Sequence, residues 1–267
     1  PAQQQGYLPS EGTLVFATDS LLQTIPMALL HDGQNYLVQK YSIATTLGGQ
    51  LRQPRSLPLA QPSTLIAGLS EEAPSFTLPQ VPKDFKPLPE VEKEVQDLKK
   101  ATHSTILLNA DFTTANFQAE LARNNFSVVH LTTHGQFSSS REDTFLLAWD
   151  KVIDVQQIYQ LVKRRTEQDA SIELLVLSAC ETAKGDRKSA LGIAGLATQA
   201  GARSTLASLW RVDASSTAMF MSQFYQHLAD GQSKAEALRS AQLGLLAAED
   251  THHPYYWAPF ILVGSWL

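Results

Sequence analysis

Two short apolar segments, each followed at once by polar residues or glycine, most constrain the fold of this chain. The first covers residues 126–135 and ends in His134 and Gly135, and the second is the run Leu174–Leu177, which leads to Cys180. Such runs suit strands that are buried on both faces, as in a parallel sheet covered by helices. The sequence therefore predicts two buried strands whose carboxyl ends carry a histidine and a cysteine.

Strand-like and helix-like patterns alternate regularly from residue 90 onwards. Val91, Val95 and Leu98 mark one face of a helix, and Ser233 and Glu236 have the spacing of a capping box. This alternation is typical of a mostly parallel sheet with helices on both faces, so the predicted class is α/β. Further strands are expected at 105–109, near 144–149, at 203–209 and at 260–263, and further helices at about 154–165, 190–200, 214–229 and 233–248.

The first ninety residues are less regular. We expect strands at 13–17, 36–46 and 63–68 and a helical turn at 25–30. Residues 70–89 hold five prolines and read as a long loop, a kind of segment that is usually functional or mobile. The expected organisation is a tail or linker over 1–12, a smaller amino-terminal part over 13–62 and a main part over 63–267.

Composition excludes several classes of function. The net charge of −5 comes without a basic stripe, which argues against binding nucleic acid, and the chain has no cluster of basic residues typical of membrane-surface binding. No apolar stretch reaches the ~20 residues of a membrane span, and no secretory signal pattern is present. A single cysteine cannot form an internal disulfide, so we expect a reducing, cytoplasmic location. The first residue is proline, so we expect a fragment that lacks an upstream part.

Cys180 and His134 have the residue types of a thiol nucleophile and its base. A free cysteine is often only a buried core residue, and most histidines, His130, His252 and His253 included, are expected to be ordinary surface or core residues. The position of both at strand ends favours a catalytic role. A thiol needs a base or a positive field to ionise at neutral pH, and the N–H of Gly135 suits an oxyanion hole.

Other chemistries lack the required spacing. The chain contains no Gly-x-Ser-x-Gly elbow, no phosphate loop of the Walker type and no histidine–cysteine grouping typical of zinc. One unusual stretch remains, residues 209–213. In the simplest interpretation Trp210 is a core residue and Asp213 caps a helix that begins at Ala214, which does not exclude a binding role as well.

The sequence resembles the CHAT domain, a caspase-like family of the separase–caspase group of cysteine peptidases. The resemblance runs in order along nearly the whole chain from residue 13. Its segments are residues 19–30, 36–42, 128–135, 175–183, 201–210, 224–225, 235–239, 253–257 and 263–264.

This resemblance implies a caspase-like three-layer α/β/α sandwich with a mostly parallel sheet and a smaller amino-terminal half. It assigns the catalytic base to His134, the nucleophile to Cys180, and the oxyanion hole to the N–H groups of Gly135 and Cys180. It also makes Trp210 and Asp213 candidates for binding the substrate residue before the cut.

Two departures from the family pattern accompany these assignments. Thr132 stands where the family often has alanine. Arg211 replaces a proline, and Ala214 stands where a second acidic residue is frequent, which weakens the case for an acidic specificity pocket.

The implied function is that of a cysteine endopeptidase acting on a protein or peptide substrate without metal or organic cofactor. An upstream regulatory module, often of helical repeats, is the expected partner. The alternative is a catalytically silent module that keeps the fold and binds another protein. Intact His134 and Cys180 argue against that alternative, because a binding module does not require them.

Overall fold

A computed structural model describes most of the chain. The described residues are 6, 8–18, 22, 25–47, 61–137, 144–167, 171–178, 181–182, 194–195, 197–210 and 212–267. Cys180 and Arg211, together with much of the helix expected over 190–200, lie outside these ranges.

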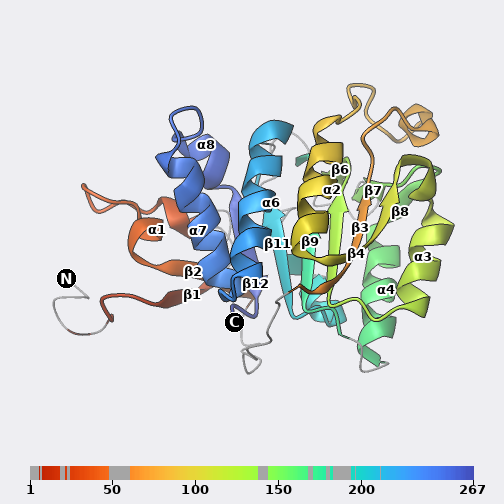
Figure 1. The fold of residues 1–267 in the computed structure, drawn as a ribbon. Coiled ribbons are helices and arrows are strands. Elements are labelled where there is room, and N and C mark those ends of the chain that lie inside the picture. The colour runs from red at the N-terminus through yellow and green to blue at the C-terminus, as the bar shows by residue number, and fades with distance from the viewer. Residues whose placement is uncertain are drawn as a thin grey trace.

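An eight-stranded sheet forms the centre of the molecule (Figure 1). Every neighbouring pair runs parallel except β11 and β12, which confirms the mostly parallel sheet expected from the sequence. In spatial order the strands are β1 (Thr13–Thr18), β2 (Ser42–Leu47), β12 (Phe260–Gly264), β11 (Ser204–Ser208), β9 (Leu174–Leu177), β5 (Val128–Thr132), β3 (Ser63–Gly68) and β4 (His103–Leu108).

Helices cover both faces of this sheet, because neighbouring residues of each strand point to opposite sides. Val128 of β5 belongs to one buried apolar cluster and Val129 to the other. One face carries α2 (Glu90–Ala101), α6 (Ala214–Ala229), α7 (Lys234–Ala247) and the short α8 (Pro254–Trp257). The other carries α3 (Thr114–Arg123), α4 (Val155–Glu167) and the helical residues 197–200. The result is the three-layer α/β/α sandwich (Figure 1).

A second, smaller sheet continues from the central strands. Its order is β10 (Glu181–Thr182), β6 (Gly135–Phe137), β7 (Phe145–Leu147) and β8 (Val152–Asp154). β6 follows β5 and β10 follows β9 along the chain, and β6 and β10 pair in parallel. The sequence predicted only one strand in this region, near 144–149. The other strands have two or three residues, which is too short for a period to show.

The amino-terminal part differs from expectation at one place. Residues 36–46 were expected to form one strand, but Leu37–Lys40 form a helical turn, α1, before β2 begins at Ser42. The side chain of Gln39 accepts a hydrogen bond from the N–H of Tyr36 at 2.8 Å and so caps this turn. The expected turn near residues 25–30 is the 3₁₀ helix η2 (Met27–Leu29).

Lys234, the first residue of α7, is almost fully buried, at 1% exposure. Burial lowers the pKa of its ammonium group to about 8, Glu173 acts in the opposite direction, and Arg203 lowers it further. Between pH 8 and the ordinary lysine value of 10.5, the unfolded chain therefore binds more protons than the folded one, so stability rises with pH in this window.

We expect Lys234→Met, which keeps the length of the stem, to be more stable than the wild type at pH 7.5. This advantage in the free energy of unfolding should shrink by about 2 kcal/mol between pH 7.5 and pH 10, where the wild-type ammonium is largely neutral in the fold. Urea denaturation of both proteins at the two pH values measures the difference. A constant difference across this range would contradict the prediction.

Candidate active site

His134 lies two residues beyond the end of β5, in the link to β6, and its side chain is buried. Its Nε2–H donates a hydrogen bond to the backbone carbonyl of Lys86 at 2.6 Å. The imidazole stacks on Phe85, with ring centroids 4.4 Å apart, and meets Phe76 edge-on at 5.4 Å. Because a carbonyl only accepts, the proton of the neutral ring is on Nε2, and Nδ1 is the basic nitrogen.

The residues that hold this ring come from the proline-rich loop 70–89. The loop is fixed at its start, where the side-chain oxygen of Asn109 accepts from the N–H of Ser70 at 2.8 Å. It is fixed again where the N–H of Ser75 donates to the carbonyl of Trp149 at 3.2 Å. The loop thus forms one wall of the His134 site. From the sequence this loop was expected to be functional or mobile, and none of its residues was named.

Lys86 and the two phenylalanines are the contacts of His134 that sequence reasoning missed. A backbone carbonyl leaves no mark in the sequence, because every residue has one. A usable signal did exist for the rings: Phe76 and Phe85 are large apolar residues within a loop that is otherwise rich in proline and polar residues.

The backbone between His134 and Gly135 has a fixed direction. The carbonyl of His134 accepts a hydrogen bond from the N–H of Leu147, on β7, at 2.8 Å. In a trans peptide unit the carbonyl and the N–H point in opposite directions. The N–H of Gly135 is therefore directed away from β7, towards the side of β6 on which β10 pairs.

The described residues on either side of Cys180 are both hydrogen-bonded to or paired with the segment that carries His134, which runs from β5 to β6. Before it, the N–H of Ser178 donates to the carbonyl of Leu131 at 2.9 Å. After it, Glu181 of β10 pairs with Gln136 of β6. The cysteine is thus separated from each of these anchors by at most one residue.

Trp210 and Asp213 follow β11, whose carboxyl end lies at the same edge of the sheet as that of β9 because the two strands are parallel. Trp210 is half-buried, and its indole N–H donates to the carbonyl of Tyr255 at 3.0 Å. Asp213 is exposed and is the N-cap of α6, where its Oδ1 accepts from the N–H of Ser216 at 3.0 Å. The capping interpretation of Asp213 is therefore confirmed, whereas its contact with substrate stays a prediction.

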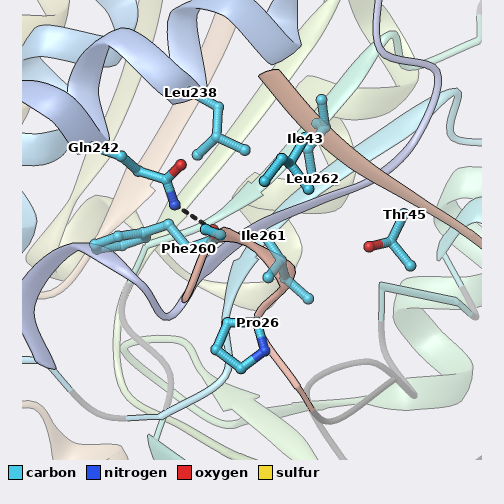
Figure 2. Close-up of a pocket in the computed structure, with 9 residues that line it drawn as sticks. Pro26, Ile43, Thr45, Leu238, Gln242, Phe260, Ile261 and Leu262 are labelled. Atoms are coloured by element: carbon cyan, nitrogen blue, oxygen red, sulfur yellow. Dashed lines mark hydrogen bonds between the residues drawn. The ribbon is translucent and has the colours of Figure 1, made fainter. Parts of the chain in front are cut away.

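A small pocket lies apart from these residues, between η2, α7 and the strands β2 and β12 (Figure 2). Its lining is mainly apolar and includes Pro26, Ile43, Leu238 and Leu262. The amide of Gln242 donates to the carbonyl of Phe260 at 3.1 Å, so this polar group is occupied by the fold itself. With no titratable side chain in its lining, the pocket does not offer the chemistry expected at His134.

Comparison with known proteins bears on the family and the fold of this chain. The family model of the CHAT domain matches residues 1–265. Tetratricopeptide repeat protein 28 of Mus musculus is 35% identical over 98 residues, which are 36% of this chain and 4% of that protein. Its counterpart from Homo sapiens is 38% identical over 66 residues, 25% of this chain and 3% of that protein. The chain thus matches only a small part of these relatives.

Solved structures show the same fold. The Arg-specific cysteine proteinase gingipain R superposes with a TM-score of 0.59 and 9% identity, covering 100% of this chain and 66% of that one. The complex of the Porphyromonas gingivalis RgpB pro- and mature domains gives 0.59 and 10%, covering 99% and 66%. The caspase-like architecture expected from the sequence is therefore confirmed. Within the described ranges, helices are all too short or too polar to cross a bilayer.

Proposed function

Since the chain belongs to the CHAT domain family, we propose that it is a cysteine endopeptidase that cleaves a protein substrate with His134 and Cys180. The observation that carries this proposal is the hydrogen bond from His134 Nε2 to the Lys86 carbonyl. It fixes the ring in the tautomer whose Nδ1 can accept a proton.

The reaction begins when Nδ1 of His134 takes the proton of the Cys180 thiol. The thiol has an ordinary pKa of about 8.5, so it is mostly protonated at neutral pH and needs this base. The carbonyl of Lys86 then stabilises the imidazolium, because its negative end faces the Nε2–H. The aromatic rings of Phe76 and Phe85 keep the imidazole from turning.

The thiolate attacks the carbonyl carbon of the scissile peptide bond and forms a tetrahedral intermediate. The N–H groups of Gly135 and Cys180 bind its oxyanion. Support for the first donor comes from the peptide plane of residues 134 and 135, which directs the Gly135 N–H away from β7. The imidazolium then returns its proton to the leaving amine, the C–N bond breaks, and water hydrolyses the resulting thioester.

A direct test is a proteome-derived peptide library incubated with the wild type and with Cys180→Ala, with cleavage read by mass spectrometry. New peptide termini that appear only with the wild type are expected. Identical digests would overturn the peptidase proposal.

A second candidate function is a catalytically silent interaction module, which the similarity to tetratricopeptide repeat proteins favours. A thiol-reactive probe separates the two. A peptidase should label at Cys180 rapidly at neutral pH and lose this rate in His134→Ala, whereas a binding module should label at the rate of a simple thiol.

The same similarity bears on regulation. We propose that a repeat module accompanies this domain in the full-length protein and controls access of substrate to His134. Comparing cleavage by the isolated domain and by the full-length protein tests this.

We also propose a cytoplasmic location, because a reducing compartment keeps the one cysteine as a thiol.

The residue before the cut is proposed to be basic, selected by the carboxylate of Asp213. Asp213→Asn separates this role from capping, because asparagine caps helices as well as aspartate does. We expect Asp213→Asn to lose the basic preference at unchanged stability, and Asp213→Ala to lose in addition about 1 kcal/mol of unfolding free energy. Cleavage-site profiles and thermal unfolding measure the two effects. A profile that is the same in Asp213→Asn and wild type would rule out the pocket role.

A further inference from the structure

A buried carboxylate lies under the candidate active site. Glu94, in the middle of α2, points into the sheet and has a side-chain exposure of 4%. Its Oε2 accepts a hydrogen bond from the hydroxyl of Thr132 at 3.0 Å. Its Oε1 accepts from the hydroxyl of Ser178 at 2.5 Å and from Nε2 of His130 at 2.9 Å. Three donors, two from β5 and one from the residue that follows β9, thus converge on one carboxylate.

The orientation of His130 is set from its other side by Tyr225 of α6. His130 Nδ1 and the Tyr225 hydroxyl are 3.1 Å apart, and both residues are buried. Burial, and secondarily the charge of Glu94, raises the pKa of Tyr225 well above its ordinary value, so the phenol keeps its proton and can donate it to Nδ1. Nε2 then carries the proton that His130 donates to Glu94. The carboxylate is therefore held by both α6 and β5.

The hydroxyls of Thr132 and Ser178 lie close in sequence to the proposed catalytic pair. Thr132 is two residues before His134, and Ser178 is two residues before Cys180. We propose that Glu94 is a positioning residue: by bonding Thr132 and Ser178 at once, it sets the distance between the segment that carries the base and the segment that carries the nucleophile. This inference rests on the proposed function.

Glu94 adds side-chain hydrogen bonds at the point where the described backbone pairing of β5 and β9 ends. Among the described residues, the paired register of β5 and β9 runs from Val128 opposite Leu174 to Leu131 opposite Leu177, and one further backbone hydrogen bond, from the N–H of Ser178 to the carbonyl of Leu131, follows it. Beyond this point the strands give way to the segments that lead to residues 134 and 180. Glu94 acts where the ladder ends, so it constrains the last residues before the proposed catalytic pair.

Energetics also favours a positioning role over a purely stabilising one. Removing a carboxylate from water is expensive, and well-packed apolar residues of similar volume often stabilise a fold as much or more. A buried carboxylate with three donors instead fixes geometry, because each hydrogen bond has a narrow range of distance and angle.

The helix α2, which carries Glu94, also lies close in sequence to Lys86, whose carbonyl accepts the hydrogen bond from His134. The helix begins at Glu90, four residues after Lys86. The side chain of Glu92 accepts from the hydroxyl of Ser70 at 3.1 Å, which ties the helix to the start of the loop 70–89. One helix therefore positions both the carbonyl that holds the His134 ring and the carboxylate that holds the two strand ends.

The test uses Thr132→Val and Ser178→Ala, each of which removes one hydroxyl from Glu94. Thr132→Ser keeps the hydroxyl and is the conservative rescue. Thr64→Val is the matched control. Thr64 is a fully buried threonine whose hydroxyl donates to the carbonyl of Pro62, and it lies near the amino-terminal end of β3, away from the carboxyl ends of the strands. None of these residues belongs to the proposed catalytic pair.

The first measurement is the rate at which iodoacetamide alkylates Cys180, the only cysteine of the chain, in each protein and in His134→Ala. We expect the part of the alkylation rate that depends on His134 to fall by up to about 100-fold in Thr132→Val and Ser178→Ala, the loss that a misplacement of about 1 Å can cause. Thr132→Ser should keep most of this rate, and Thr64→Val all of it. The double variant should lose less than the product of the single losses, because both hydroxyls act through one carboxylate.

The second measurement is amide hydrogen exchange at Ser178, whose N–H bonds Leu131. It should accelerate in Thr132→Val and Ser178→Ala but not in Thr64→Val. Unchanged exchange, or faster exchange with an intact His134-dependent alkylation rate, would overturn the positioning role. If Cys180 is alkylated at the same rate in His134→Ala as in the wild type, the proposed function is overturned instead. The exchange data would still decide whether Glu94 joins the two strand ends.

Discussion

Replacing Cys180 with alanine should reduce peptide cleavage to background, and replacing His134 with alanine should reduce it by about 10²–10⁴-fold. The first variant removes the atom that forms the thioester. The second removes the base, and the thiol then remains protonated at neutral pH. Initial rates on a cleaved library peptide measure both effects. The two residues act as a unit, so the double variant should be little worse than Cys180→Ala alone.

Thermal unfolding is the control for these variants, because the ring of His134 is packed between Phe76 and Phe85. Both variants should remain folded. His103→Ala, which alters an exposed histidine at the start of β4, should keep full activity. Full cleavage by Cys180→Ala would end the cysteine-peptidase proposal.

Gly135→Val should lower turnover by about 10²–10³-fold, the usual loss for one oxyanion-hole donor. The N–H of Gly135 points away from β7, and a branched side chain on this residue would occupy the space that the substrate carbonyl needs to reach it. Valine suits a strand, so β6 should still form. The expected signature is a large fall in kcat with a small shift in melting temperature.

Gly135→Ala gives a graded comparison. Its smaller side chain should cause a smaller fall in kcat than valine does. If instead both variants melt at lower temperature and cleave at the wild-type rate, Gly135 is only a structural residue at the start of β6.

The sequence predicted best those elements whose signals are local. The helix expected over 214–229 has these bounds in the structure, with Asp213 as its cap. The capping box of Ser233 and Glu236 is present at the start of α7. β3 also has the expected bounds, 63–68, because its apolar run ends at a glycine. In each case the residues that decide the element lie within it or next to it.

Elements that depend on distant partners were missed. In the second sheet these are β6, β8 and β10, which are only two or three residues long and are defined by pairing with their neighbours, whereas β7 lies within the strand expected near 144–149. The turn of α1 was hidden in an expected strand, because four residues are too few to show a helical period.

The residues of the candidate site also differ in whether their role could be recognised from neighbouring residues in the sequence. His134 could be singled out from its own neighbours in the sequence. The contribution of Lys86 comes from its backbone carbonyl, 48 residues away along the chain. Glu94 lies 84 residues from Ser178 and reads in the sequence as one of many helix carboxylates. Only the fold reveals that these groups converge.

The antiparallel pair of β11 and β12 has a consequence for the synthesis of the protein. β12 lies between β11 and β2, so β1 and β2 join the rest of the sheet only through residues 260–264. A ribosome makes β1 and β2 more than two hundred residues earlier. β2 therefore lacks its neighbour β12 until residues 260–264 have left the exit tunnel. Contacts so distant in sequence are slow to form, which makes completion of the sheet a late event in the folding of residues 13–264.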